Sequence, residues 1–143
     1  MQKLSGNTSC APLLAAAAVA GKGAYCPYSR YPVGAAVETD DGRIFAGANL
    51  ENASYGLTIC AERVAIAAAV GQGHRRLRRL ALVAGTARHP ALPCGACLQV
   101  MAEFAWPDFE ILIAPRGRTK QVVRYLLGDL LPSAFTLRPH ARS

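Results

Sequence analysis

The residues most able to do chemistry in this chain are three cysteines in two short motifs. The segment "PCGAC" at residues 93–97 places Cys94 and Cys97 in a Cys-x-x-Cys pair, and "TICAERVAI" at 58–66 contains Cys60. A Cys-x-x-Cys pair alone is compatible with either a metal site or a redox motif. A catalytic zinc site uses three protein ligands and a water, whereas a structural zinc site is normally closed by four. Three thiols therefore favour a catalytic zinc ion.

Two charged residues beside Cys60 fit such a site. Three thiolates around a dication leave about one net negative charge, which needs compensation where the site is partly buried. Both cysteine motifs are expected at helix N-termini, which carry partial positive charge, and Arg63 is placed to donate hydrogen bonds to a thiolate. Glu62, in the first turn of the same helix, is expected to reach a water at the metal without binding the metal. The predicted roles are proton transfer for Glu62 and thiolate charge compensation for Arg63.

Hydrophobic patterns predict the elements that must position these residues. Helices are expected at residues 10–22, 58–70 and 94–104, with a short helical turn at 124–132. Strands are expected at 33–39, 42–50, 77–85, 110–114 and 118–123, the first two joined by the hairpin-type turn "DDG". Alternation of strands and helices in the second half implies βαβ units and a partly parallel sheet. The predicted class is α/β, with a mixed five-stranded sheet sandwiched by helices.

Length and composition indicate one folded domain. The chain has 143 residues, of which 52% are hydrophobic and 17% charged. A single domain over residues 1–143 is expected, with residues 1–9 and 137–143 loosely ordered.

Charge and hydropathy limit which partners and which cellular compartment are expected. Much of the net charge of +7 lies in "HRRLRR" at residues 74–79, which we interpret as a solvated helix end, with a polyanion-binding patch as the alternative. The Ala-rich run at 11–20 has no basic segment before it and favours a helix over an export signal. No run reaches the ~18 to 20 apolar residues that span a bilayer. A cytoplasmic protein without a membrane or nucleic-acid partner is expected.

Four segments between about residues 24 and 135 carry a family resemblance: "YCPYSRYPVGAAV", "GANLENASYGLTICAERVAI", "PCGACLQV" and "LLPSAF". Cys-Ala-Glu followed by Pro-Cys-x-x-Cys is the three-cysteine version of the zinc deaminase signature, in which the glutamate is the general acid/base. Together the segments resemble the small homotetrameric cytidine deaminases of pyrimidine salvage. The resemblance implies a three-layer α/β/α sandwich, one zinc ion per subunit held by Cys60, Cys94 and Cys97, and active sites shared between subunits. It also implies hydrolytic deamination of cytidine and 2′-deoxycytidine to uridine and 2′-deoxyuridine with release of ammonia.

The resemblance further implies how a nucleoside is bound. Asn49 and Glu51 would hydrogen-bond the ribose 3′-hydroxyl, and Ala61 would offer its backbone N–H to the base carbonyl. Without the family, Asn49 and Glu51 would equally be turn formers, and aromatic residues would ordinarily pack in the core. The resemblance also implies that Tyr31 and Phe135 form walls of the pyrimidine site, with Phe135 reached across a subunit boundary. Ala53 and Tyr55, from a neighbouring subunit, would face the 5′ end of the sugar.

Two positions depart from the family pattern. Tyr31 stands where phenylalanine is usual, so its hydroxyl needs a partner or water. Leu98 stands where an arginine commonly follows the last cysteine, so Arg63 is expected to carry more of the charge compensation. Cys10 and Cys26 match no ligand position and are expected to be buried as small apolar residues.

Three other functions remain open at this stage. The same zinc chemistry could act on another cytosine nucleoside, such as blasticidin S, although the ribose-binding segment "ENASY" argues against it. A polynucleotide-editing deaminase is favoured by the charge, but a site closed by neighbouring subunits leaves little room for a strand. A non-catalytic zinc-stabilised binding module is opposed by the absence of a fourth ligand.

Overall fold

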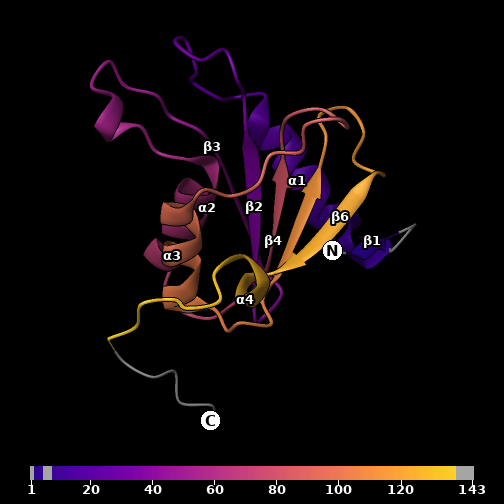
Figure 1. Cartoon of the computed structure of the whole chain (residues 1–143), viewed down its shortest axis with the longest axis vertical. Coiled ribbons are helices and arrows are strands. Elements are labelled where there is room, and N and C mark those ends of the chain that lie inside the picture. Colours follow the sequence, from indigo (N-terminus) through magenta and orange to yellow (C-terminus); the bar gives the residue numbers. More distant parts are fainter. Residues whose placement is uncertain (1, 5–7, 138–143) are drawn as a thin grey trace.

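The computed structural model describes residues 2–4 and 8–137 of the chain (Figure 1). The expected loose ordering of residues 1–9 and 137–143 falls largely outside this range. No helix among the described residues is long and apolar enough to cross a membrane. The elements in chain order are β1 (Gln2–Leu4), the 3-10 helix η1 (Thr8–Cys10), α1 (Ala11–Gly21), β2 (Gly34–Thr39), β3 (Ile44–Ala48), the 3-10 helix η2 (Tyr55–Leu57), α2 (Ala61–Gly71), β4 (Leu77–Val83), α3 (Gly95–Phe104), β5 (Glu110–Ala114), β6 (Val122–Leu126) and α4 (Leu127–Leu130).

The strands form one mixed sheet in the order β1-β6-β5-β4-β2-β3. Strands β4 and β5 are parallel and are connected by α3, whereas the pairs β2–β3, β2–β4 and β5–β6 are antiparallel. Strands β3 and β4 therefore run in the same direction on either side of β2, with α2 as their crossover. The expected five-stranded sheet is confirmed as β2 to β6, and the three-residue strand β1 extends it beyond β6.

One expected strand lies further along the chain than its sequence pattern suggested. The strand predicted at 118–123 is observed as β6, Val122–Leu126. Hydrogen bonds from Arg118 N to the Pro115 carbonyl (3.1 Å) and from Gln121 N to the Arg118 carbonyl (2.9 Å) close successive turns after β5. These turns take up residues 115–121, so pairing with β5 begins later.

The helices cover both faces of the sheet and make it the middle of three layers (Figure 1). Helix α1 packs on one face, against Ala36, Ala81 and Val83, and α2 and α3 pack on the other, which includes Leu80 and Leu82. Successive residues of β4 thus point to opposite faces, as a strand requires. The expected α/β/α sandwich is confirmed.

The close approach of α1 to the sheet depends on a glycine. A Cβ added at Gly34 in β2 would lie 1.9 Å from the Ala17 carbonyl oxygen and 2.6 Å from the Gly21 amide nitrogen, both in α1. Real Cβ atoms do not come this close to backbone, so no larger residue fits at Gly34 without separating the two layers.

The basic run at 74–79 is divided between a loop and β4. Arg75 donates to the Val70 carbonyl at the end of α2, as the helix-end interpretation requires. Arg78 and Arg79 lie in β4 and pair with Glu38 of β2, at 3.4 and 2.7 Å between nitrogen and oxygen. The helix-end interpretation is therefore wrong for these two arginines, whose charge is partly neutralised within the sheet.

Candidate metal and substrate site

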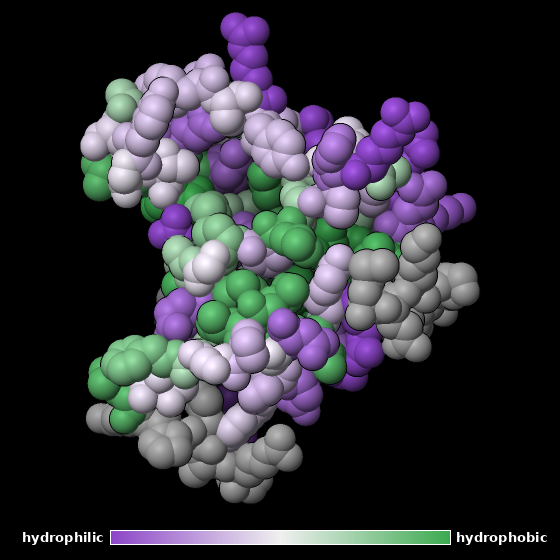
Figure 2. Space-filling view, viewed as in Figure 1, coloured by the Kyte–Doolittle hydropathy of each residue, from purple (hydrophilic) through white to green (hydrophobic). Residues whose placement is uncertain are grey.

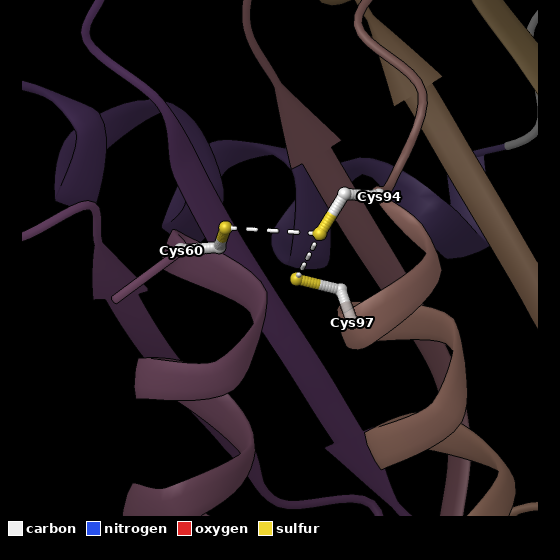
Figure 3. A group of neighbouring side chains, drawn as sticks. All are labelled: Cys60, Cys94 and Cys97. Carbon is white, nitrogen blue, oxygen red and sulfur yellow. Dashed lines mark hydrogen bonds between the residues drawn. The ribbon is translucent and has the colours of Figure 1, made fainter. Parts of the chain in front are cut away.

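Three cysteine sulfurs converge at the N-termini of α2 and α3 (Figure 3). Cys60 Sγ lies 4.0 Å from Cys94 Sγ, which lies 3.5 Å from Cys97 Sγ. A tetrahedral zinc ion with Zn–S bonds of ~2.3 Å would hold its sulfurs ~3.8 Å apart, so the observed spacings bracket the required one. Among the described residues, this is the only group of three or more His, Cys, Asp or Glu side chains that could hold a metal ion. The donor set fits zinc.

The start of each helix explains why these sulfurs are free to bind. Cys60 is the N-cap of α2 and Cys94 the N-cap of α3, both with extended backbone, and neither side chain caps its helix. Cys97 follows in the first turn of α3. The first backbone N–H groups of both helices have no partner within the helix, so their partial positive charge favours thiolates at this point. Cys97 is buried while Cys94 is exposed, so the cluster reaches the surface on one side.

Arg63 supplies a positive charge that contacts the cluster. Its Nη2 atom donates to Cys60 Sγ at 3.8 Å and to the Thr58 carbonyl at 3.2 Å. Its Nε is buried and has no partner among the described residues. Hydrogen bonds from the Cys97 thiol and from Arg63 lower the pKa of Cys60 to about 5, and the shared hydrogen bond with Cys60 and burial raise the pKa of Cys97. The cluster thus carries a thiolate at neutral pH.

Leu98 adds no charge to the cluster. Its side chain is buried in the core formed by α2, α3 and the sheet. Among the described residues, Arg63 is therefore the one guanidinium that hydrogen-bonds to a sulfur of the cluster. Cys10 is buried as expected, but Cys26 is only half-buried, so the expectation for Cys26 was wrong in part; it lies in a surface turn before β2.

Glu62 lies beside the cluster with almost no access to solvent. Its exposed fraction is 4%, and Ala61 before it is fully buried. Burial, and to a smaller extent the negative charge of Cys60, raise the pKa of Glu62 above its usual value. A carboxyl group whose pKa is raised toward neutrality exchanges protons more readily at neutral pH. The structure thus places an acid/base group next to the predicted metal.

Asn49 follows β3 and uses both polar atoms of its side chain to hold the segment before β2. Its Nδ2 donates to the Tyr31 carbonyl at 2.9 Å, and its Oδ1 accepts from Val33 N at 2.9 Å. Both bonds join residues 16 and 18 positions apart in the sequence, so Asn49 connects two segments and its side chain does not close a local turn.

Glu51 is buried and is held by the same segment. Its Oε2 accepts from the backbone N–H groups of Tyr28 (2.9 Å) and Ser29 (3.2 Å), and its Oε1 accepts from the Ser29 hydroxyl. The Ser29 hydroxyl and these amides lower the pKa of Glu51, so it is an anion at neutral pH. Tyr28, Ser29, Glu51, Tyr55 and Thr58 line a cavity of about 370 Å³. Tyr28 and Ser29 carry no predicted role, although both lie in the first of the four segments of the family resemblance.

The predicted aromatic contacts lie on the surface of the single chain. Exposed fractions are 44% for Tyr31, 75% for Tyr55 and 69% for Phe135, so core packing is not their role, and Ala53 is also exposed. The Tyr31 hydroxyl reaches the end of β4, where it would lie 2.8 Å from a Cβ added at Gly85. The Phe135 carbonyl accepts from Gln99 Nε2 of α3 at 2.8 Å, a contact that the sequence did not predict.

Comparison with known proteins gives consistent matches over most of the chain. The family model described as the cytidine and deoxycytidylate deaminase zinc-binding region matches residues 9–112. A cytidine deaminase of Halalkalibacterium halodurans is 47% identical over 125 residues, which cover 87% of this chain and 92% of that protein. The crystal structure of cytidine deaminase from Burkholderia pseudomallei superposes with a TM-score of 0.80 at 45% identity, over 87% of this chain and 98% of that one. A blasticidin-S deaminase of Bacillus cereus is more distant, at 29% identity over 119 residues.

Fold and site together define a class of enzyme. A three-layer α/β/α sandwich that brings three thiols and a buried glutamate together at two helix N-termini is the arrangement of a zinc-dependent deaminase. The chain belongs to the cytidine and deoxycytidylate deaminase family, and it is a hydrolytic enzyme with zinc as its cofactor. The family, enzyme class and cofactor expected from the sequence are confirmed.

Proposed function

We propose that the chain deaminates cytidine and 2′-deoxycytidine to uridine and 2′-deoxyuridine, with release of ammonia, as a step of pyrimidine salvage in the cytoplasm. The observation that carries this proposal is the buried Glu62 beside three sulfurs spaced for a tetrahedral zinc ion. The names of its relatives support the choice of nucleoside.

In the proposed mechanism, Cys60, Cys94 and Cys97 hold the metal and Glu62 moves the protons. Zinc at this site supplies the Lewis acidity that lowers the pKa of a water molecule. Glu62 takes a proton from the attacking water and delivers it to N3 of cytosine as the oxygen adds to C4. Glu62 then transfers the second proton of that water to the C4 amino group, the C4–N bond breaks, and ammonia leaves as the C4 carbonyl forms.

The same site offers groups that orient the nucleoside. The N–H of Ala61, at the free N-terminus of α2, would donate to the base carbonyl. Asn49 and Glu51 would bind the ribose 3′-hydroxyl, Glu51 as an acceptor that lines the cavity described above. Tyr31 would form one wall of the pyrimidine site.

We further propose a homotetramer in which neighbouring subunits complete each site. Figure 2 shows hydrophobic side chains gathered in a hollow of the surface between the loops around η2 and the segment after α4. A surface of this kind is typical of a protein interface. Phe135, in the segment after α4, and Ala53 and Tyr55, in the region of η2, would reach the pyrimidine and the sugar 5′ end of adjacent subunits. The large exposed apolar residues of the chain include Tyr25, Leu50, Tyr55, Leu57, Leu92, Phe135 and Leu137.

The second candidate substrate is blasticidin S, which the more distant relative names. The chain's greater identity to cytidine deaminases and its buried, anionic Glu51 favour a nucleoside with a free ribose.

An absorbance assay of purified protein tests the proposal. Cytidine, 2′-deoxycytidine and blasticidin S would be compared on a sample whose zinc content and mass in solution are also measured. We expect turnover of the first two, about one zinc per chain and the mass of four chains. Turnover of blasticidin S without turnover of cytidine would contradict the proposed substrate, and full activity of a single chain would contradict the shared site.

A further inference from the structure

A tight turn before β2 forms a receptor for the Glu51 carboxylate. Arg30 N donates to the Cys26 carbonyl at 3.0 Å, and Arg30 closes the turn in the left-handed region, at φ 54°. The N–H groups of Tyr28 and Ser29 inside this turn both donate to Glu51 Oε2. Consecutive N–H groups in such a turn make a concave anion site.

The Ser29 hydroxyl adds the third hydrogen bond and connects two predicted substrate contacts. It donates to Glu51 Oε1 and accepts from Tyr31 N at 3.1 Å. A serine hydroxyl has one proton to donate and two lone pairs, so both interactions can be made at once. One side chain thus joins the predicted ribose ligand to the predicted wall of the pyrimidine site.

The two carboxylate oxygens of Glu51 differ in how many further hydrogen bonds they can accept. Oε2 already accepts from two backbone amides, whereas among the described residues Oε1 accepts only from Ser29. A carboxylate oxygen accepts about two hydrogen bonds, so Oε1 keeps capacity for one more donor. Since Glu51 and Ser29 both line the cavity of about 370 Å³, a sugar hydroxyl there can supply that donor.

We infer that Ser29 is a positioning residue, whose hydroxyl fixes the orientation in which Glu51 presents Oε1 to the 3′-hydroxyl of the nucleoside. This inference rests on the proposed function, because it assigns to Glu51 the ribose contact proposed above. Without the Ser29 hydroxyl, the backbone amides still hold Oε2, but the carboxylate can rotate about that anchor. Recognition of the 3′-hydroxyl should then weaken while the zinc site and Glu62 stay intact.

The test compares substrates that differ at the 3′ position. Wild-type protein and Ser29→Ala would be assayed with cytidine and 2′-deoxycytidine, which carry the 3′-hydroxyl, and with 2′,3′-dideoxycytidine, which lacks it. We expect Ser29→Ala to lower kcat/KM for the first two about tenfold, mainly through KM, and for the third less than twofold. Ser29→Thr, which keeps a hydroxyl, should restore most of the loss.

Matched measurements separate positioning from folding. Thr119→Ala removes a hydroxyl from the turn between β5 and β6 and should leave all three substrates unchanged. If Ser29→Ala does not fold, Ser29→Cys can be assayed on the same three substrates instead, because a thiol is a much weaker hydrogen-bond donor than a hydroxyl. If Ser29→Ala lowers kcat/KM equally for all three substrates, or for none of them, the inference about Ser29 is overturned while the proposed function stands. Wild-type protein without activity on cytidine would overturn the proposed function and the inference together.

Discussion

Replacement of Arg63 by methionine should weaken zinc binding although no ligand is removed. The Arg63 guanidinium lies 3.8 Å from Cys60 Sγ, and burial of Leu98 in the core leaves no second arginine on the cluster among the described residues. Three thiolates around zinc carry about one net negative charge, so the loss of this cation leaves part of that charge without compensation.

The expected loss of zinc affinity follows from the hydrogen bond between Arg63 and Cys60 Sγ. A hydrogen bond to a charged group contributes about 1.5–3 kcal/mol. Because 1.4 kcal/mol corresponds to a factor of ten, zinc affinity should fall about tenfold to a hundredfold. The fold should change little in stability, because the substitution loses the hydrogen bond to the Thr58 carbonyl but also removes the buried Nε that has no partner among the described residues. Arg63→Lys keeps a positive charge but not the planar guanidinium, and its zinc affinity should lie between those of the wild type and Arg63→Met.

Competition with a chromophoric chelator near neutral pH measures this affinity directly. Arg118→Met, which removes a charge from the distant turn between β5 and β6, is the control and should bind zinc as tightly as the wild type. If Arg63→Met also binds zinc as tightly as the wild type, the assignment of charge compensation to Arg63 is refuted.

Three other predictions address the fold and the cluster. Arg79→Met should lower the free energy of unfolding, measured in urea, by about 3 kcal/mol, because it removes the closest cation from Glu38, whose side chain is only 8% exposed. A second substitution, Glu38→Gln, in the same chain should recover part of this loss. Gly34→Ala should lower the free energy of unfolding by at least about 3 kcal/mol, because its Cβ would lie 1.9 Å from a backbone oxygen of α1. In the control Gly71→Ala, the new Cβ has no atom within 4 Å, so this variant should not be destabilised. In zinc-free protein, alkylation of Cys60 should rise with pH around a midpoint of about 5 rather than 9.0, because its lowered pKa makes the thiolate present above that pH; a midpoint near 9.0 would contradict the assigned hydrogen bonds.

The position of each cysteine motif at a helix start could be predicted because its determinants are local. Each of the two motifs places a cysteine immediately before an apolar helical run, so spacing alone locates the thiols at helix starts. The positions of Glu62 and Arg63 relative to Cys60 follow from the same first turn. The strands with strong hydrophobic patterns were found for the same reason, including β5 at its observed bounds.

The contacts that escaped prediction join residues far apart in the sequence. Ser29 and Glu51 are 22 residues apart and Arg79 and Glu38 are 41 apart, so only the assembled sheet brings each pair together. Strand β1 is three residues long and exists through its pairing with β6, more than a hundred residues away, which no local pattern reveals. Patterns in the sequence identify residues with reactive groups, but tertiary packing decides which neighbours hold them in place.

The most direct test of the central claim is the rate of cytidine deamination by Glu62→Gln, measured on protein of known zinc content. The substitution removes the acid/base group but leaves Cys60, Cys94 and Cys97 in place. General acid–base catalysis contributes about 10²- to 10⁴-fold per group, and this group moves both protons, so we expect a rate at least about 10³-fold lower at full zinc content. Deamination at the wild-type rate by the zinc-loaded variant would contradict the account.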